Sequence, residues 1–299
     1  MNLRVFLYRT SPLLWFLLLS IPHHPFSRWL DAEFIIPYGF ESMQLAADIG
    51  SAALALGMVV VAVVFVRRAG PDRWKHVGFW AFLLFSMVVV DRTLIINNIE
   101  RIHYPQYALM SILLGLTIRN ESLLLLAASF AGLADEVLQF AMNPEKTAYL
   151  DFNDIVLNIL GAAFGTALVM AFRKREKQEP SEYEMRFRLG LSFSALTIVA
   201  IVLLAGFTGR IIPVAEAGTK RSVIGSFDGK LSLILAFEQH PQFWEQSDYG
   251  KVFHVLSPWE GVILAGSLLV VLYLLIRWLK SSRNGASHAC GTNEKVLVK

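Results

Sequence analysis

Six polar side chains gather in a short stretch of an otherwise apolar sequence. They are Asp135, Glu136, Gln139, Asp151, Asp154 and Asn158. Glu136 and Gln139 are three residues apart, so in a helix they share a face. The same holds for Asp154 and Asn158, which are four residues apart. Carboxylates held on helix faces can bind a polar ligand or carry out acid–base chemistry. We therefore take Glu136 and Asp154 as candidate catalytic residues, and the candidate substrate-binding residues in this stretch are Gln139, Asp151 and Asn158.

A second polar segment, residues 91–107, carries further reactive groups. His103 is a candidate catalytic base, because an imidazole titrates near neutral pH. Arg92 and Tyr107 are candidate substrate-binding residues, although Arg92 is also well placed to neutralise Asp91 or a neighbouring acid. A purely structural interpretation stays open for both segments, since buried polar networks also fix helix packing.

The residue spacing does not predict a metal site. His103, Glu136 and Asp154 are chemically acceptable ligands, but no H-E-x-x-H type of motif brings them together in the sequence. The sequence also lacks Walker, dinucleotide-binding and G-x-S-x-G motifs. We therefore expect neither a metal nor another cofactor.

Membrane helices must position these groups. Hydrophobic residues make up 55% of the 299 residues and charged residues only 17%, and the mean hydropathy is +0.51, which is typical of a membrane protein. Stretches long enough to cross about 30 Å of hydrocarbon predict eight spans. These are residues 5–21, 48–66, 77–96, 104–118, 121–141, 154–172, 188–207 and 261–279. The expected fold class is an all-α polytopic membrane protein.

The distribution of basic residues predicts the orientation of these spans. If the N-terminus is cytoplasmic, 18 of the 27 Lys and Arg residues fall in cytoplasmic segments, as the positive-inside rule requires. We therefore expect a multi-pass cell-membrane protein with both termini in the cytoplasm. This asymmetry also accounts for the net charge of +3, so nucleic acid is not an expected partner.

In this orientation the two polar segments lie at the outer ends of the spans. A charged group within the bilayer costs about 2.5–3.5 kcal/mol on insertion scales, so such groups face a protein interior or a watery cavity. We therefore expect a polar pocket that opens outward.

A charged linker, FRKREKQEPSEYEMRFR, predicts the boundary between two units. Residues 1–176 form a six-span unit, and residues 177–299 form a two-span unit with an outer segment, 208–260, and a cytoplasmic tail. Within the outer segment, Asp228-Gly229 lies between apolar arms and predicts a β-hairpin. We expect this segment to form a small ordered cap.

Three sequence blocks within residues 95–170 share a pattern with a known family. IHYPQYALMSILL has a His followed by a Tyr four residues later, GLADEVLQF contains E-x-x-Q, and LDFNDIVLNILGAAFG contains D-x-x-D-x-x-x-N leading into G-x-x-x-G. Together they resemble the VanZ-like membrane domain. That family takes its name from accessory resistance to a glycopeptide antibiotic, so the resemblance implies a role in the cell envelope, without a settled reaction.

Two functions follow as hypotheses. In the first, the outward pocket binds or modifies a lipid headgroup or a cell-wall precursor, and whether it catalyses a reaction stays open. In the alternative, the chain is a non-catalytic subunit or assembly factor of a larger membrane complex, which it contacts through 208–260 and its last two spans. A permease is less favoured, because the sequence lacks the clear inverted repeats of such proteins.

Overall fold

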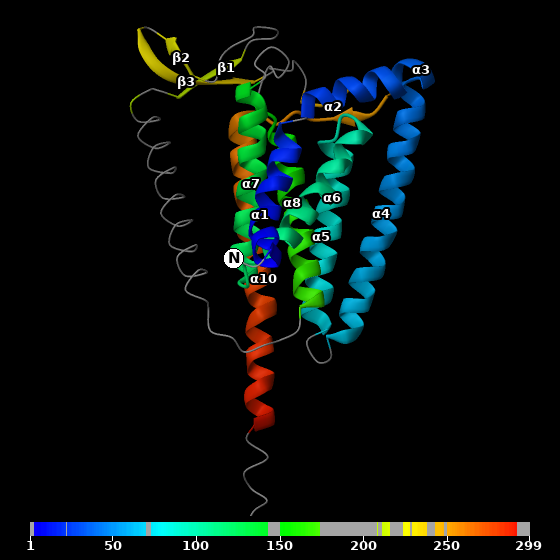
Figure 1. Ribbon diagram of the computed structural model, residues 1–299, viewed down its shortest axis with the longest axis vertical. Helices are drawn as coiled ribbons and strands as arrows, with labels where there is room; N and C mark the ends of the chain where they lie inside the picture. Colours follow the sequence, from blue (N-terminus) through cyan, green and yellow to red (C-terminus); the bar gives the residue numbers. More distant parts are fainter. Residues whose placement is uncertain are drawn as a thin grey trace, which may run out of the picture.

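The computed structural model is a bundle of helices with small β segments at one end (Figure 1). It describes residues 3–21, 23–69, 73–142, 150–173, 208, 211–215, 224–227, 229–237, 243–247 and 250–291. The helices are α1 Leu3–Ser20, α2 His23–Leu30, the π-helix η1 Asp31–Ile35, α3 Ile36–Tyr38, α4 Phe40–Arg68, α5 Arg73–Thr93, the 3-10 helix η3 Asn98–Ile102, α6 His103–Gly115, α7 Glu121–Met142, α8 Phe152–Phe172 and α10 Pro258–Gly291. The strands are β1 Ile211–Ala215, β2 Ile224–Phe227, β3 Lys230–Phe237, β4 Glu245–Gln246 and β5 Val252–Phe253.

Five of the described helices, α4, α5, α7, α8 and α10, are long and apolar enough to cross a membrane. The chain is therefore a membrane-embedded helical protein. They coincide with five of the predicted spans, 48–66, 77–96, 121–141, 154–172 and 261–279, and confirm that these stretches are long apolar helices. The part of α1 whose side chains the structure describes, Thr10–Ser20, leaves the span predicted over 5–21 untested, and the predicted span 188–207 lies outside the described residues.

Helix α6 is shorter than the span predicted over 104–118. Its 13 residues extend about 20 Å, less than the hydrocarbon thickness. The helix ends at Gly115, and turns at Leu116 and Thr117 follow. The side chain of Asn120 then accepts a hydrogen bond from the Leu123 N–H at 3.0 Å and caps the start of α7. Hydropathy alone therefore overestimated the length of this helix.

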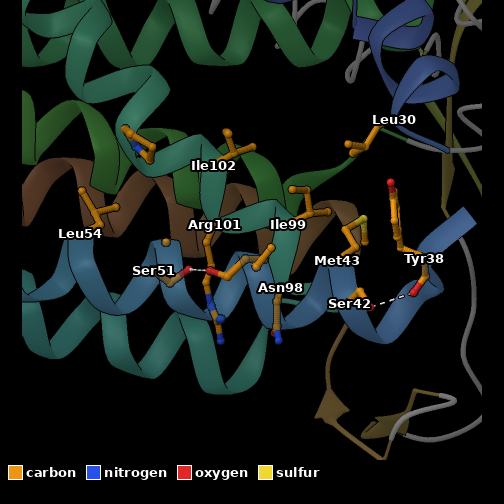
Figure 2. A pocket seen from close by; sticks show the side chains of 14 residues that line it. Leu30, Tyr38, Ser42, Met43, Ser51, Leu54, Asn98, Ile99, Arg101 and Ile102 are labelled. Carbon is orange, nitrogen blue, oxygen red and sulfur yellow. Dashed lines mark hydrogen bonds between the residues drawn. The ribbon is translucent and has the colours of Figure 1, made fainter. Parts of the chain in front are cut away.

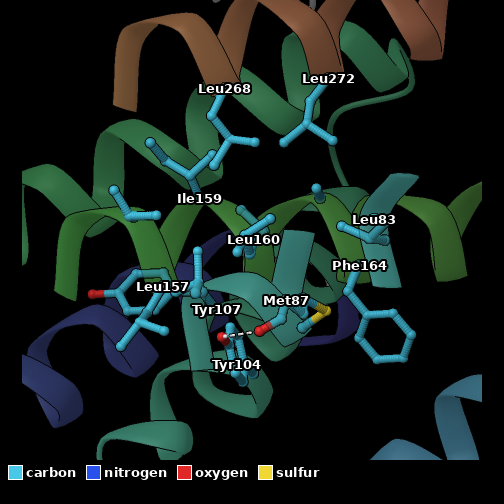
Figure 3. Packing of buried hydrophobic residues seen from close by; sticks show 14 of the residues in the cluster. Leu83, Met87, Tyr104, Tyr107, Leu157, Ile159, Leu160, Phe164, Leu268 and Leu272 are labelled. Carbon is cyan, nitrogen blue, oxygen red and sulfur yellow. Dashed lines mark hydrogen bonds between the residues drawn. The ribbon is translucent and has the colours of Figure 1, made fainter. Parts of the chain in front are cut away.

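Helix α8 is the centre of the bundle. It packs against α5, α6, α7 and α10, and Figure 3 shows it between α6 on one side and α10 on the other. In its apolar window 78% of the residues are buried, against 11% in α4. The large difference means that α8 forms the core, whereas α4 exposes most of its apolar surface.

Two glycines of α8 allow α6 to approach closely. A Cβ added at Gly161 would lie 2.7 Å from the carbonyl oxygen of Tyr104, and one at Gly165 would overlap the backbone of Ala108. The G-x-x-x-G stripe is therefore a helix-packing surface. By bringing the two backbones together, it also places the start of α6 beside the first turns of α8.

The predicted hairpin is confirmed. Strands β2 and β3 pair antiparallel with Phe227 opposite Lys230, and Gly229 in the turn has a φ of +72°, which glycine adopts without strain. Strand β1 pairs parallel with the other side of β3, a pairing that the sequence did not predict. The sheet lies at the end of the bundle where α7 ends and α8 and α10 begin, here called the cap end (Figure 1).

The side chain of Asn153 joins the segment before α10 to the bundle. Its Nδ2 donates to the carbonyl oxygens of Leu94 at 2.8 Å and His254 at 2.9 Å, and its Oδ1 accepts from the Leu256 N–H at 3.0 Å. The described part of the outer segment next to α10 is therefore docked on α5 and α8. Helix α10 packs on α8; the division into two units at the charged linker stays a prediction.

Candidate functional site

A buried polar cluster lies at the cap end, where α6 and α8 begin. We use the name acid–histidine cluster for His103, Glu136, Asp154 and Asn158. His103 Nδ1 lies 2.8 Å from Asn158 Oδ1, and Asn158 Nδ2 donates to Glu136 Oε1 at 2.9 Å. His103 Nε2 lies 3.4 Å from Asp154 Oδ2. His103, Glu136 and Asn158 are almost fully buried, whereas the Asp154 side chain is 19% exposed, so any ligand reaches the cluster past Asp154.

The hydrogen bonds of Asn158 determine the tautomer of His103. Asn158 Nδ2 has two acceptors nearby, Glu136 Oε1 and the Gly132 carbonyl oxygen at 3.4 Å, so the amide oxygen must face the imidazole. An oxygen only accepts, and His103 Nδ1 therefore carries the proton. The neutral imidazole then presents the lone pair of Nε2 to a carboxylate oxygen of Asp154, and a proton or a cation between these two acceptors would remove their repulsion.

Tyr107 and Asp135 extend the cluster along α6 and α7. The Tyr107 hydroxyl donates to Asp135 Oδ2 at 2.6 Å, and its ring is parallel to that of His103, with centroids 6.4 Å apart. Asp135 is only 2% exposed, and its Oδ1 has no hydrogen-bond partner among the described residues. Two buried acids of α7, Asp135 and Glu136, therefore lie beside the partly exposed Asp154 of α8.

Asp151 acts as the N-cap of α8. Its Oδ1 accepts hydrogen bonds from the N–H groups of Asn153 at 2.9 Å and Asp154 at 3.2 Å. Burial raises the pKa of Asp151, and these two hydrogen bonds oppose that shift. Burial, reinforced by the Asp154 carboxylate, likewise raises the pKa of Glu100 to about 8. Burial is thus the leading cause of both shifts.

A second polar network lies on the other side of α6, between α4 and α5. Arg101 bonds to Asp48 through Nη1 at 2.5 Å and to Asp91 through Nε at 2.5 Å and Nη2 at 3.1 Å. Asp91 is therefore neutralised by Arg101. The sequence had suggested Arg92 for this pairing, and Arg101 makes it instead.

Two cavities border this network. The larger, of about 930 Å³, is lined mainly by apolar residues of α4 and η3 together with Arg101 and Asn98 (Figure 2). The smaller, of about 440 Å³, lies between α4 and α5, and Arg92 and Tyr104 line it. Arg92 is therefore placed at this cavity and away from His103, which faces α7 and α8.

The structure brings together most of the residues predicted from the sequence. His103, Glu136, Asp154 and Asn158 form the cluster, Tyr107 extends it, and Asp151 caps the helix beside it. Gln139 is a buried residue of α7. The sequence analysis missed the roles of Arg101 and Asn153. A signal for Arg101 was present, because Asp48 in the N-terminal part of α4 and Asp91 near the C-terminal end of α5 fall on the same side of the membrane in the predicted topology.

No protein-family model, curated protein or solved structure matches this chain.

Proposed function

We propose that this chain is a VanZ-like integral membrane protein of the cell envelope, which binds or modifies the headgroup of a membrane lipid or of a lipid-linked cell-wall precursor at the acid–histidine cluster. In this proposal the chain has eight spans and cytoplasmic termini, so the cap end faces outward. The five long apolar helices support the membrane location, and the charge distribution supports the orientation.

One observation carries this proposal, namely the buried acid–histidine cluster at an end of the membrane helices. Ionisable groups at membrane depth are expensive and usually mark functional sites. A network that only packs helices needs each donor matched to an acceptor. Here His103 Nε2 faces Asp154 Oδ2 at 3.4 Å, and the neutral imidazole supplies no donor between these two atoms. Two facing acceptors of this kind suit a site that takes up a proton or a ligand.

The cavities beside α4 supply space for lipid chains. They lie next to a helix whose apolar window is only 11% buried, and their walls are largely apolar. The polar residues Arg101 and Asn98 line the wall of the larger cavity, and no residue of the acid–histidine cluster lines either cavity.

The test compares lipids retained by purified variants. Glu136→Gln and Asp154→Asn preserve shape but remove charge, and Glu41→Gln is a matched control on the exposed first turn of α4. We expect wild type and Glu41→Gln to retain the same headgroup class, measured by mass spectrometry of co-purified lipids, and the two cluster variants to lose it at unchanged secondary structure. Identical lipid profiles and melting temperatures for all four proteins would exclude a headgroup site at the cluster.

The alternative, a non-catalytic subunit, has support from α10. Only 22% of its apolar window is buried, which leaves a membrane-facing surface that suits lipid or a partner helix. Purification in a mild detergent separates the two functions, because a subunit would elute with a partner in constant stoichiometry, whereas a lipid-binding protein would elute without one.

A further inference from the structure

The acid–histidine cluster has the donor set of a metal site. His103, Glu136 and Asp154 come from three different helices, and one donor atom of each lies within 4.8 Å of the others. An imidazole with two carboxylates suits divalent first-row metals. Three protein ligands that leave a fourth position open are typical of catalytic zinc sites.

The distance between His103 and Asp154 fits a shared metal ion. Zinc binds nitrogen and oxygen ligands at about 2.0–2.2 Å, so two ligands of a tetrahedral ion lie about 3.4 Å apart. His103 Nε2 and Asp154 Oδ2 are separated by 3.4 Å. Glu136 supplies the third donor atom, which lies within 4.8 Å of the other two. One of its oxygens accepts from Asn158, which leaves the other for the ion.

Asn158 supplies the support that a metal-binding histidine requires. Such a histidine normally donates its second ring N–H to an acceptor, which fixes the tautomer and the ring orientation. Asn158 Oδ1 accepts from His103 Nδ1 at 2.8 Å, so Nε2 is left free to bind the ion. Asn158 is 0% exposed and is therefore a rigid support.

The charge balance also calls for a cation. Among the described residues, no Lys or Arg forms an ion pair with Asp135, Glu136 or Asp154, and Asp135 Oδ1 has no hydrogen-bond partner there. Arg101 already binds two other acids, Asp48 and Asp91. Uncompensated acids are costly to bury, and a divalent ion would remove this cost.

We propose that His103, Glu136 and Asp154 bind a divalent transition-metal ion, with Zn²⁺ as the first candidate, and leave one coordination position open at the exposed side of Asp154. The ion would attract the phosphate of a headgroup, which the acids alone would repel. The metal site concerns the same cluster as the proposed function but requires no assumption about the substrate.

The experiment uses the full-length protein, purified in detergent with a tag that contains no histidine and stripped with EDTA. Wild type, Asp154→Asn, Glu136→Gln and the control His254→Gln are titrated with ZnCl₂. His254 lies outside the cluster and bonds to Phe243 and Glu260. We expect about one Zn²⁺ per chain and a higher melting temperature for wild type and His254→Gln, and at least tenfold weaker binding for the two cluster variants.

A second measurement covers variants that fail to fold. Co²⁺ added to stripped wild-type protein should produce visible absorption bands that saturate at one equivalent and disappear when Zn²⁺ is added. The metal site is refuted if wild type shows no such bands, or if folded Asp154→Asn binds zinc as tightly as wild type. A proton shared by His103 and Asp154 would then remain as the explanation of their contact. Lipid retention is measured in parallel. Failure of the zinc result would refute the metal site without refuting the headgroup site, and failure of the lipid result would do the reverse.

Discussion

At the scale of single residues, Asn158 organises the cluster. It is fully buried and bonds at once to His103, Glu136 and the Gly132 carbonyl. A Cβ at Gly132 would lie 2.7 Å from the Asn158 Cβ, so the glycine is needed for this close approach. The side chain thereby fixes the imidazole tautomer, on which both the proton and the metal alternatives depend.

Replacing Asn158 should therefore cost stability. Asn158→Leu leaves buried groups of His103 and Glu136 without their partner, and we expect a loss of about 2–4 kcal/mol in the free energy of unfolding. Asn98→Leu is the control, because its bond to Asp48 is exposed, and the expected loss is below about 1 kcal/mol. Denaturation in detergent measures both, and an unchanged Asn158→Leu transition would contradict the organising role.

The residue types of the cluster could be predicted from the sequence, but their contacts could not. Glu136 and Asn158 lie on different helices, and their bond depends on how α7 and α8 pack. The spacing of His103 from the acids matches no metal motif, because His103, Glu136 and Asp154 converge only through tertiary structure. Sequence periodicity reports which residues share one helix face, and it carries no information on which faces meet.

At the scale of elements, the contact between α6 and α8 holds the site in place. Hydropathy predicted α8 well, since an apolar run continues through the whole helix. Hydropathy overestimated the length of α6. The turn at Leu116 and Thr117 belongs to the same apolar stretch as the helix, so a hydropathy window does not show where the helix ends.

The glycine stripe of α8 gives this packing a direct test. Gly165→Ala would push a methyl group into the backbone of Ala108, and overpacking of this kind costs about 1–3 kcal/mol. Gly57→Ala on α4 is the matched control, because a Cβ there meets nothing within 4 Å, and alanine should stabilise that helix by up to about 1 kcal/mol. Thermal melting in detergent should lower the transition of the first variant only. Equal transitions would show that α6 and α8 do not approach this closely.

At the scale of the whole molecule, Asn153 links the outer segment to the bundle. Its three hydrogen bonds reach both the end of α5 and the segment before α10. Asn153→Ala should release residues 250–257, so we expect faster amide hydrogen exchange there and unchanged exchange in the core of α8. Glu41→Ala, on the exposed first turn of α4, serves as the control, and protection identical to wild type in Asn153→Ala would mean that other contacts hold the segment.

The orientation of the whole protein can be tested with its only cysteine, Cys290, which lies near the end of α10. The uneven distribution of Lys and Arg predicts that this end of α10 is cytoplasmic and that the β2–β3 hairpin is outside. A membrane-impermeant thiol reagent should therefore label Cys290 only after the cells are permeabilised. In a Cys290→Ser background, Lys230→Cys places the thiol at the start of β3 and should react in intact spheroplasts. The opposite labelling pattern would place the acid–histidine cluster at the cytoplasmic face, and the headgroup that it meets would then belong to the inner leaflet.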